Sequence, residues 1–195
     1  MQRLDGTAPI PPGLHGGIVA LGNFDGFHLG HQAVVGAAVA RARAEGRPAI
    51  VATFDPHPMR FFRPETPPFR LTTLDQRERL FADAGADAML VFAFDAGLAA
   101  LTPAGFVDRL ANDLGAAGFV TGSDFTFGKG RAGDIAGLRA LAAERGCSVD
   151  TVGPVEDAGG AISSSRIRAL LRGGDPRGAA ALLTRPFAIS AEVVG

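Results

Sequence analysis

The sequence of 195 residues is poor in cysteine and in long apolar runs. Its single cysteine, Cys147, has no partner for an intrachain disulfide and no neighbouring thiol for a metal cluster, which points to a reducing compartment such as the cytoplasm. No apolar run approaches the roughly 18 residues of a membrane span, and residues 1–17 lack the basic start and apolar core of a signal peptide. We therefore expect a soluble cytoplasmic protein with no membrane partner.

An excess of charge is also missing. Lys and Arg number 19 against 20 Asp and Glu, so the formal net charge is -1 and no long-range field attracts polyanions. This argues against a nucleic-acid partner and requires any phosphate site to be local. With 47% hydrophobic residues, the chain has ample material for the core of one compact domain.

The order of apolar segments predicts an α/β fold. Short β-branched stretches bounded by Gly, Pro or Asp indicate buried parallel strands at Gly17–Leu21, Ala49–Phe54, Ala88–Phe94, Gly118–Thr121 and Cys147–Val152. Between them, segments that each close at a glycine predict helices at His31–Glu45, Leu74–Ala84, Pro103–Leu114 and Asp134–Arg145. The alternation indicates a Rossmann-like, doubly wound sheet of about five parallel strands with helices on both faces.

Three further segments complete the predicted organisation. The Pro-rich run Pro58–Pro68 predicts a loop. After a Gly-rich turn at Asp157–Gly160 we expect two short helices, Ser163–Leu171 and Asp175–Leu183. Residues 186–195 alternate apolar with other residues and predict a strand with no following partner.

The first motif that carries chemistry is Gly22–His31, between the first predicted strand and the first helix. Open α/β sheets bind ligands at this edge, and the motif contains neither G-x-G-x-x-G nor G-x-x-x-x-G-K-[ST], which disfavours a dehydrogenase or a P-loop kinase. His28 and His31 can project from the same side of the first helical turn, where free N–H groups favour an anion and Gly30 lets it approach. A metal pair or plain surface polarity are the other interpretations of such histidines.

The second motif is Ile162–Arg168, at the start of a late helix. Its serines can simply cap the helix. Three hydroxyls followed by Arg166 and Arg168 can also form a second anion pocket, because a guanidinium binds two phosphate oxygens at once. Two anion pockets suit a polyphosphate.

At these motifs the sequence resembles the FMN adenylyltransferase module of bacterial bifunctional riboflavin kinase/FAD synthetases, within the nucleotidyltransferase superfamily. The resemblance covers nearly the whole chain. It includes three further segments, Thr53–Pro58, Gly122–Asp134 and the Arg185-Pro-Phe junction. The first two of these elements narrow the superfamily to the flavin enzymes.

The resemblance implies attack of the FMN phosphate on the α-phosphorus of Mg-ATP, which gives FAD and pyrophosphate without a covalent enzyme intermediate. It implies catalytic roles for His28, His31 and Arg168, and a nucleotide pocket formed by Gly22, Asn23, Phe24, Asp25, Gly30, Ser163, Ser164 and Ser165. It places the flavin at Pro56, His57, Asp124, Phe125 and Phe127. The phenylalanines can alternatively anchor a long loop onto the sheet.

Mg²⁺ is expected to arrive with ATP and to have no direct protein ligand. Water-mediated contact through Asp25 or Asp55 fits an ion that keeps much of its hydration, although both carboxylates can equally cap turns. Lys129, the sole lysine, can meet a phosphate or can reflect only a preference for arginine.

Two positions depart from the family pattern: Ser165 replaces the usual Thr, and Ala161 stands where some members have arginine. We expect residues 1–185 to form the adenylyltransferase domain and residues 186–195 to begin a riboflavin kinase barrel that continues in the intact protein, so that this chain lacks kinase activity. Two alternatives stay open. One is a transferase of AMP or CMP to another phosphorylated acceptor, such as phosphopantetheine or nicotinamide mononucleotide. The other is a domain that binds flavin or nucleotide without turnover.

Overall fold

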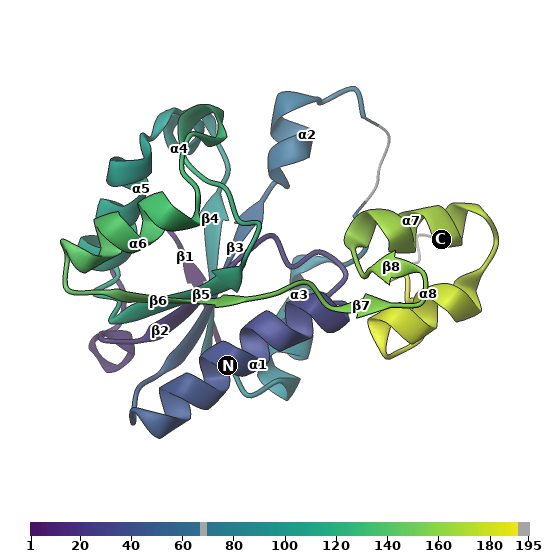
Figure 1. Ribbon diagram of the computed structural model, residues 1–195, viewed down its shortest axis with the longest axis horizontal. Helices are drawn as coiled ribbons and strands as arrows, with labels where there is room; N and C mark the ends of the chain where they lie inside the picture. The colour runs from purple at the N-terminus through teal and green to yellow at the C-terminus, as the bar shows by residue number, and fades with distance from the viewer. Residues whose placement is uncertain (67–69, 191–195) are drawn as a thin grey trace, which may run out of the picture.

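The centre of the protein is a sheet of six parallel strands, shown in Figure 1. The computed structural model describes residues 1–66 and 70–190. The sheet has the strand order β1-β4-β3-β2-β5-β6. Its strands are β1 (Gln2–Asp5), β2 (Ile18–Leu21), β3 (Ala49–Asp55), β4 (Ala88–Ala93), β5 (Gly118–Gly122) and β6 (Ser148–Val152).

Helices cover both faces of this sheet, as the doubly wound prediction requires. In Figure 1, α1 (Leu29–Ala44) and α3 (Leu74–Asp83) lie on one face. The other face carries α4 (Ala96–Ala100), α5 (Pro103–Asp108), which continues into a π-helical turn at residues 109–113, and α6 (Ile135–Ala143). Because both faces are covered, strands β2 to β5 are almost continuously buried. The Rossmann-like fold class is confirmed.

The order in which successive strands are added to the sheet changes direction at β2. From β2 the chain proceeds through β3 to β4 on one side, whereas β5 and β6 lie on the other side. The carboxyl ends of β2 and β5 therefore form a topological switch point, where α/β sheets bind ligands. The segment Gly22–His31 begins at this point.

Two elements differ from the sequence-based prediction. Strand β1 was missed because Gln2–Asp5 is mostly polar and exposed, and it gains its place through parallel pairing with β4 at the sheet edge. The Pro-rich run predicted as a loop instead begins with a short helix, α2 (Pro58–Phe62). Proline at the first helical position costs nothing there, and the His57 ring caps the helix by accepting from the Met59 amide.

A small lobe beyond β6 packs beside the carboxyl edge of the sheet. It contains the hairpin β7 (Glu156–Asp157) and β8 (Gly160–Ala161), then α7 (Ser164–Arg172) and α8 (Pro176–Leu183) (Figure 1). The lobe has its own apolar cluster around Ile167 and Leu183, which Leu71 joins from the main domain. Both predicted late helices are thus present.

The structure describes only the first half of the expected C-terminal strand. Residues 186–190 have no regular secondary structure, and residues 191–195 lie outside the described residues. Whether residues 186–195 begin a second domain stays a prediction. Among the described residues, no helix combines the length and apolar character needed to cross a membrane.

Phe81 on α3 offers a test of the packing beneath the switch point. Its side chain is 0% exposed and contacts the rings of Phe24 and Phe27 edge to face. We expect Phe81→Ala to lower the free energy of unfolding by about 3–5 kcal/mol, the usual cost of a large buried cavity. Phe62→Ala, at a side chain 64% exposed, is the matched control and should change it by less than about 0.5 kcal/mol. Equal midpoints of urea denaturation for the two variants would contradict this packing.

Candidate functional site

The turn between β2 and α1 has an unusual backbone. Phe24 and Phe27, neither of them glycine, adopt φ values of 48° and 46°, and Gly26 lies at 87°. Left-handed conformations of bulky residues are costly and persist only where packing enforces them. Here the two buried rings pack on Phe81, which holds the turn in this shape.

His28 and His31 meet at the start of α1. Their rings stack with centroids 3.7 Å apart and planes inclined by 23°. Among the described residues, the buried Nδ1 atom of each ring has no hydrogen-bond partner. Unpaired buried polar atoms are rare in proteins and call for an explanation, of which a ligand is one.

Both rings are held in the neutral form. Burial lowers the pKa of His28 to about 4; nearby Arg168 lowers it further, while Asp25 opposes the shift. Burial also lowers the pKa of His31 well below its ordinary value, followed in importance by His28, Arg77 and Arg168. At neutral pH each ring therefore has one N–H donor and one acceptor nitrogen.

The amino end of α1 is arranged to accept an anion. His28 occupies the N-cap position without a side-chain cap, whereas α3 to α8 all have one. The carbonyl oxygens of the preceding turn are bound elsewhere: that of Gly26 accepts from Arg185, and that of Phe27 accepts from Arg185 and Gln32. Since N–H and C=O point in opposite directions along a trans peptide, the His28 amide faces away from those donors. The first-turn amides can then bind negative charge.

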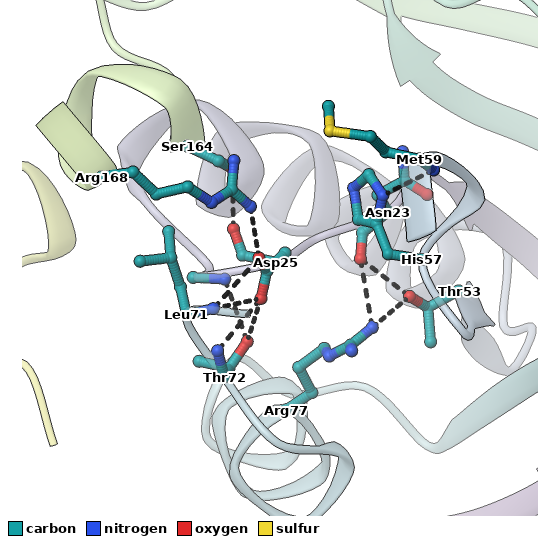
Figure 2. A network of polar contacts seen from close by, with 11 residues as sticks. Asn23, Asp25, Thr53, His57, Met59, Leu71, Thr72, Arg77, Ser164 and Arg168 are labelled. Atoms are coloured by element: carbon teal, nitrogen blue, oxygen red, sulfur yellow. Dashed lines mark hydrogen bonds and ion pairs between the residues drawn. The ribbon is translucent and has the colours of Figure 1, made fainter. Parts of the chain in front are cut away.

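The second motif lies directly against this turn, as Figure 2 shows. Ser163 caps α7 by accepting from the Arg166 amide. The hydroxyl of Ser164 donates to the main-chain oxygen of Asp25 at 2.8 Å, and Arg168 donates to the Asp25 carboxylate at 2.5 Å. The two motifs therefore lie against each other, through contacts between residues 139 and 143 positions apart in the chain.

The Asp25 carboxylate is the centre of this arrangement. Its oxygens accept from the Leu71 and Thr72 amides, the Thr72 hydroxyl and Arg168, and the side chain is only 3% exposed. The Thr72 hydroxyl also accepts from the Gly26 amide. Because its oxygens already accept from these donors, Asp25 fits a structural role better than the water-mediated magnesium contact expected from the sequence.

Arg166 has a different place from the one predicted. Its guanidinium forms a bidentate pair with Asp157 and donates to the Gly160 carbonyl, which fastens α7 to the β7–β8 hairpin. It therefore does not join Arg168 in the second anion pocket. Ser165 is exposed, so its hydroxyl makes no buried contact that depends on the methyl group of threonine.

The residues expected to bind flavin divide into two groups. Pro56 and His57 follow β3 near the site, where burial first, and also Arg168 and Arg77, lower the pKa of His57 to about 4 although Asp25 opposes them. Asp124 is exposed after β5. Phe127 is buried in the core against Phe106 and Phe125. The alternative that these rings anchor their loop therefore accounts for Phe127, and Phe125 packs partly against the same core.

An aromatic surface missed by the sequence analysis lies on the other side of the switch point. The rings of Phe61 and Phe62 on α2 contact Phe94 after β4, with centroids 5.5 and 5.8 Å away. Phe62 is 64% exposed. The adjacent phenylalanines Phe61 and Phe62 were the sequence signal for this surface. It was missed because the segment was predicted to be a loop, whereas helix α2 brings these rings together with Phe94.

The described residues contain no cluster of three or more His, Cys, Asp or Glu side chains able to hold a metal ion. Asp55 forms an ion pair with Arg70 at 2.8 Å. Lys129 is exposed in a turn where its amide donates to the Leu101 carbonyl. Its contact with a phosphate remains untested.

The sequence analysis assigned no role to two arginines that brace the turn. Arg77 on α3 donates to the Asn23 carbonyl, and Arg185 donates to the carbonyls of Gly26 and Phe27. Arg77 was detectable in principle, because its spacing from Leu74 and Phe81 puts a charge on the apolar face of the helix.

Two Arg–Asp pairs on α7 allow a matched test of the Asp25 contact. Asp25→Asn removes the charge partner of Arg168, and breaking so buried a pair should lower the free energy of unfolding by about 3 kcal/mol. Asp157→Asn weakens the exposed pair with Arg166 and should cost less than about 1 kcal/mol. Chemical denaturation measures both, and an equal loss in the two variants would mean that Asp25 is not the anchor of this lobe.

Comparison with known proteins agrees with the motifs. Residues 11–166 match the family model described as FAD synthetase. The bifunctional riboflavin kinase/FMN adenylyltransferase of Pseudomonas fluorescens is 38% identical over 100% of this chain and 62% of that protein. The protein of the same name from Escherichia coli strain K12 is 36% identical over 92% of this chain and 58% of that protein.

A solved structure shows the same architecture. It is named a macrolide-efflux protein from Streptococcus pneumoniae, and it matches with a TM-score of 0.85 at 28% identity, covering 96% of this chain and 61% of that chain. The present chain spans about three-fifths of the length of the first curated relatives that it matches. Because the family match extends from before β2 into α7, the chain belongs to the FAD synthetase family.

Proposed function

We propose that this chain transfers AMP from Mg-ATP to FMN, giving FAD and pyrophosphate. The observation that carries the proposal is the joining of the two anion-binding motifs at one switch point through Asp25 and Ser164. An oxygen of the FMN phosphate attacks the α-phosphorus of ATP. As that bond forms, the bond from the α-phosphorus to the bridging oxygen breaks, and its electron pair leaves with pyrophosphate.

The histidines act in this proposal as neutral hydrogen-bond donors to the ATP phosphates. Their lowered pKa values keep them uncharged before ATP binds, and a triphosphate beside them would raise those values because an anion favours the protonated ring. Charge developing at the α-phosphoryl group is then met by donors fixed in advance. Such preorganised contacts are usually the largest single contribution to this kind of catalysis.

Arg168 and the serines at the start of α7 would hold the departing pyrophosphate. Arg168 is already oriented toward the turn by Asp25, so little ordering is needed when phosphate arrives. Gly22, Asn23, Phe24 and Gly30 would shape the nucleotide pocket. Mg²⁺ would enter with ATP and offset phosphate charge, and of the two carboxylates considered, Asp55 fits a water-mediated contact better than Asp25.

For the acceptor, the aromatic surface of the exposed Phe62 and the partly buried Phe61 and Phe94 supports stacking of the isoalloxazine ring. It adjoins Pro56 and His57, which the resemblance assigns to flavin. The buried ring of Phe127 packs against Phe106 and Phe125 and anchors its own loop after β5. Transfer to another phosphorylated acceptor and binding without turnover are the competing functions, and a cytoplasmic location remains a prediction.

Pyrophosphate release in the presence and absence of FMN tests the reaction. We expect release from Mg-ATP that requires FMN, and we expect His31→Ala to slow it roughly a hundred- to thousandfold, because one preorganised donor is lost. His15→Ala is the control, since His15 is exposed and precedes the opposite end of β2. Release with another acceptor but not with FMN, or bound flavin without release, would support the competing functions instead.

Steady-state kinetics with Phe62→Ala tests the acceptor surface. Loss of an aromatic stacking partner should raise the KM for FMN several-fold, on the order of 1 kcal/mol of binding, while the KM for ATP stays unchanged. Because Phe62 is largely exposed, stability should also be unaffected. An unchanged KM for FMN would mean that the flavin does not bind at α2.

A further inference from the structure

Arg77 is a buried cation with no ion-pair partner among the described residues. The residue is 2% exposed and lies on α3 beneath the turn that follows β2. Within residues 1–66 and 70–190, no carboxylate forms an ion pair with it, although Asp25 and Asp55 are close enough to favour its charge. Burial lowers the pKa of Arg77. Burying an ion is expensive unless other charges or hydrogen bonds compensate for the lost hydration.

The hydrogen bonds of Arg77 are few and point to the turn. One Nη atom donates to the Thr53 hydroxyl at 2.9 Å and to the Asn23 carbonyl at 3.3 Å, and Thr53 itself donates to that carbonyl at 2.9 Å (Figure 2). In the described part of the chain, the buried Nε atom of Arg77 has no hydrogen-bond acceptor, and the buried Oδ1 atom of Asn23 has no donor. The guanidinium is therefore incompletely satisfied.

These contacts also orient the main chain. With the Asn23 carbonyl held toward Arg77 and Thr53, the following amide of Phe24 points to the opposite side. Arg77 also influences the site through space, since its charge helps to lower the pKa of His31. Arg77 thus combines a fixed positive charge with a bracing contact to the turn.

We propose that Arg77 is a positioning residue of the triphosphate site. Its charge is buried behind the turn without an ion-pair partner in the described residues, although Asp25 and Asp55 favour it, and the phosphates of the nucleotide would add matching negative charge on the other side of the turn. Its contact with Asn23 directs the turn toward those phosphates. This inference rests on the proposed function. It adds a residue that touches neither substrate nor the reacting atoms.

Three variants separate charge, hydrogen bonding and packing. Arg77→Met removes the charge and keeps the length of the side chain, Arg77→Lys keeps the charge, and Arg77→Gln keeps a donor without charge. Arg79→Met is the matched control, because it makes the same change at an exposed position of the same helix. The dissociation constant of Mg-ATP measured by titration calorimetry and the midpoint of urea denaturation are the two readouts.

We expect Arg77→Met to weaken Mg-ATP binding about tenfold or more, with a denaturation midpoint equal to or above that of the unmodified chain. Arg77→Lys should recover more of the affinity than Arg77→Gln. Unchanged affinity in Arg77→Met would overturn the inference. Loss of affinity that merely follows a lowered midpoint, or better recovery by Gln than by Lys, would also overturn it and assign Arg77 to the fold alone.

The unmodified chain separates this inference from the function on which it rests. If it releases pyrophosphate with FMN while Arg77→Met binds Mg-ATP equally well, the proposed function stands and the role of Arg77 fails. If the unmodified chain neither binds Mg-ATP nor releases pyrophosphate, both proposals fail.

Discussion

The hydrogen bonds and ion pair of the Asp25 carboxylate hold the candidate site together. Four donors from two distant segments converge on this one buried side chain: the Leu71 and Thr72 amides, the Thr72 hydroxyl and Arg168. A buried carboxylate requires such partners because its lost hydration must be replaced. The need to satisfy one charge therefore places the start of α7 beside the start of α1. The C-terminal lobe also meets the rest of the domain through its small apolar cluster and through Arg185, which donates to the Gly26 and Phe27 carbonyls.

Around the Asp25 carboxylate, positively charged arginines outnumber their carboxylate partners, which suits an anionic ligand. Arg168 has a carboxylate partner, whereas Arg77 and Arg185 brace the turn through main-chain carbonyls, and the two stacked histidines are neutral. Local positive potential thus collects at the switch point although the whole chain has a formal charge of -1. The phosphate recognition that we propose would therefore depend on a few buried groups and on backbone amides, in keeping with the absence of a long-range field.

Sequence patterns predicted what depends on local chemistry. The five strands from β2 to β6 and the helix that begins after His28 follow from runs of apolar residues and closing glycines. Strand β1 has no such run and forms because it pairs with the edge of β4. Helix α2 was missed because prolines at its start were interpreted as a loop signal. The pairing of Asp25 with Arg168 joins residues 143 apart. Spacing cannot reveal it, and the motif resemblance predicted a shared site without indicating which atoms join it. The role predicted for Arg166 in phosphate binding was wrong for the same reason. Its partner Asp157 lies on a hairpin that forms only in the folded lobe, so sequence spacing does not reveal the pair.

The most direct test of the account is a crystal structure of the chain with Mg²⁺ and a non-hydrolysable ATP analogue. The account predicts phosphate groups between the first turn of α1 and the start of α7, within hydrogen-bonding distance of His28 or His31 on one side and of Ser163, Ser164 or Arg168 on the other. A nucleotide bound elsewhere, or one that contacts only one of the two motifs while Asp25 keeps them joined, would contradict the claim that they form a single triphosphate site.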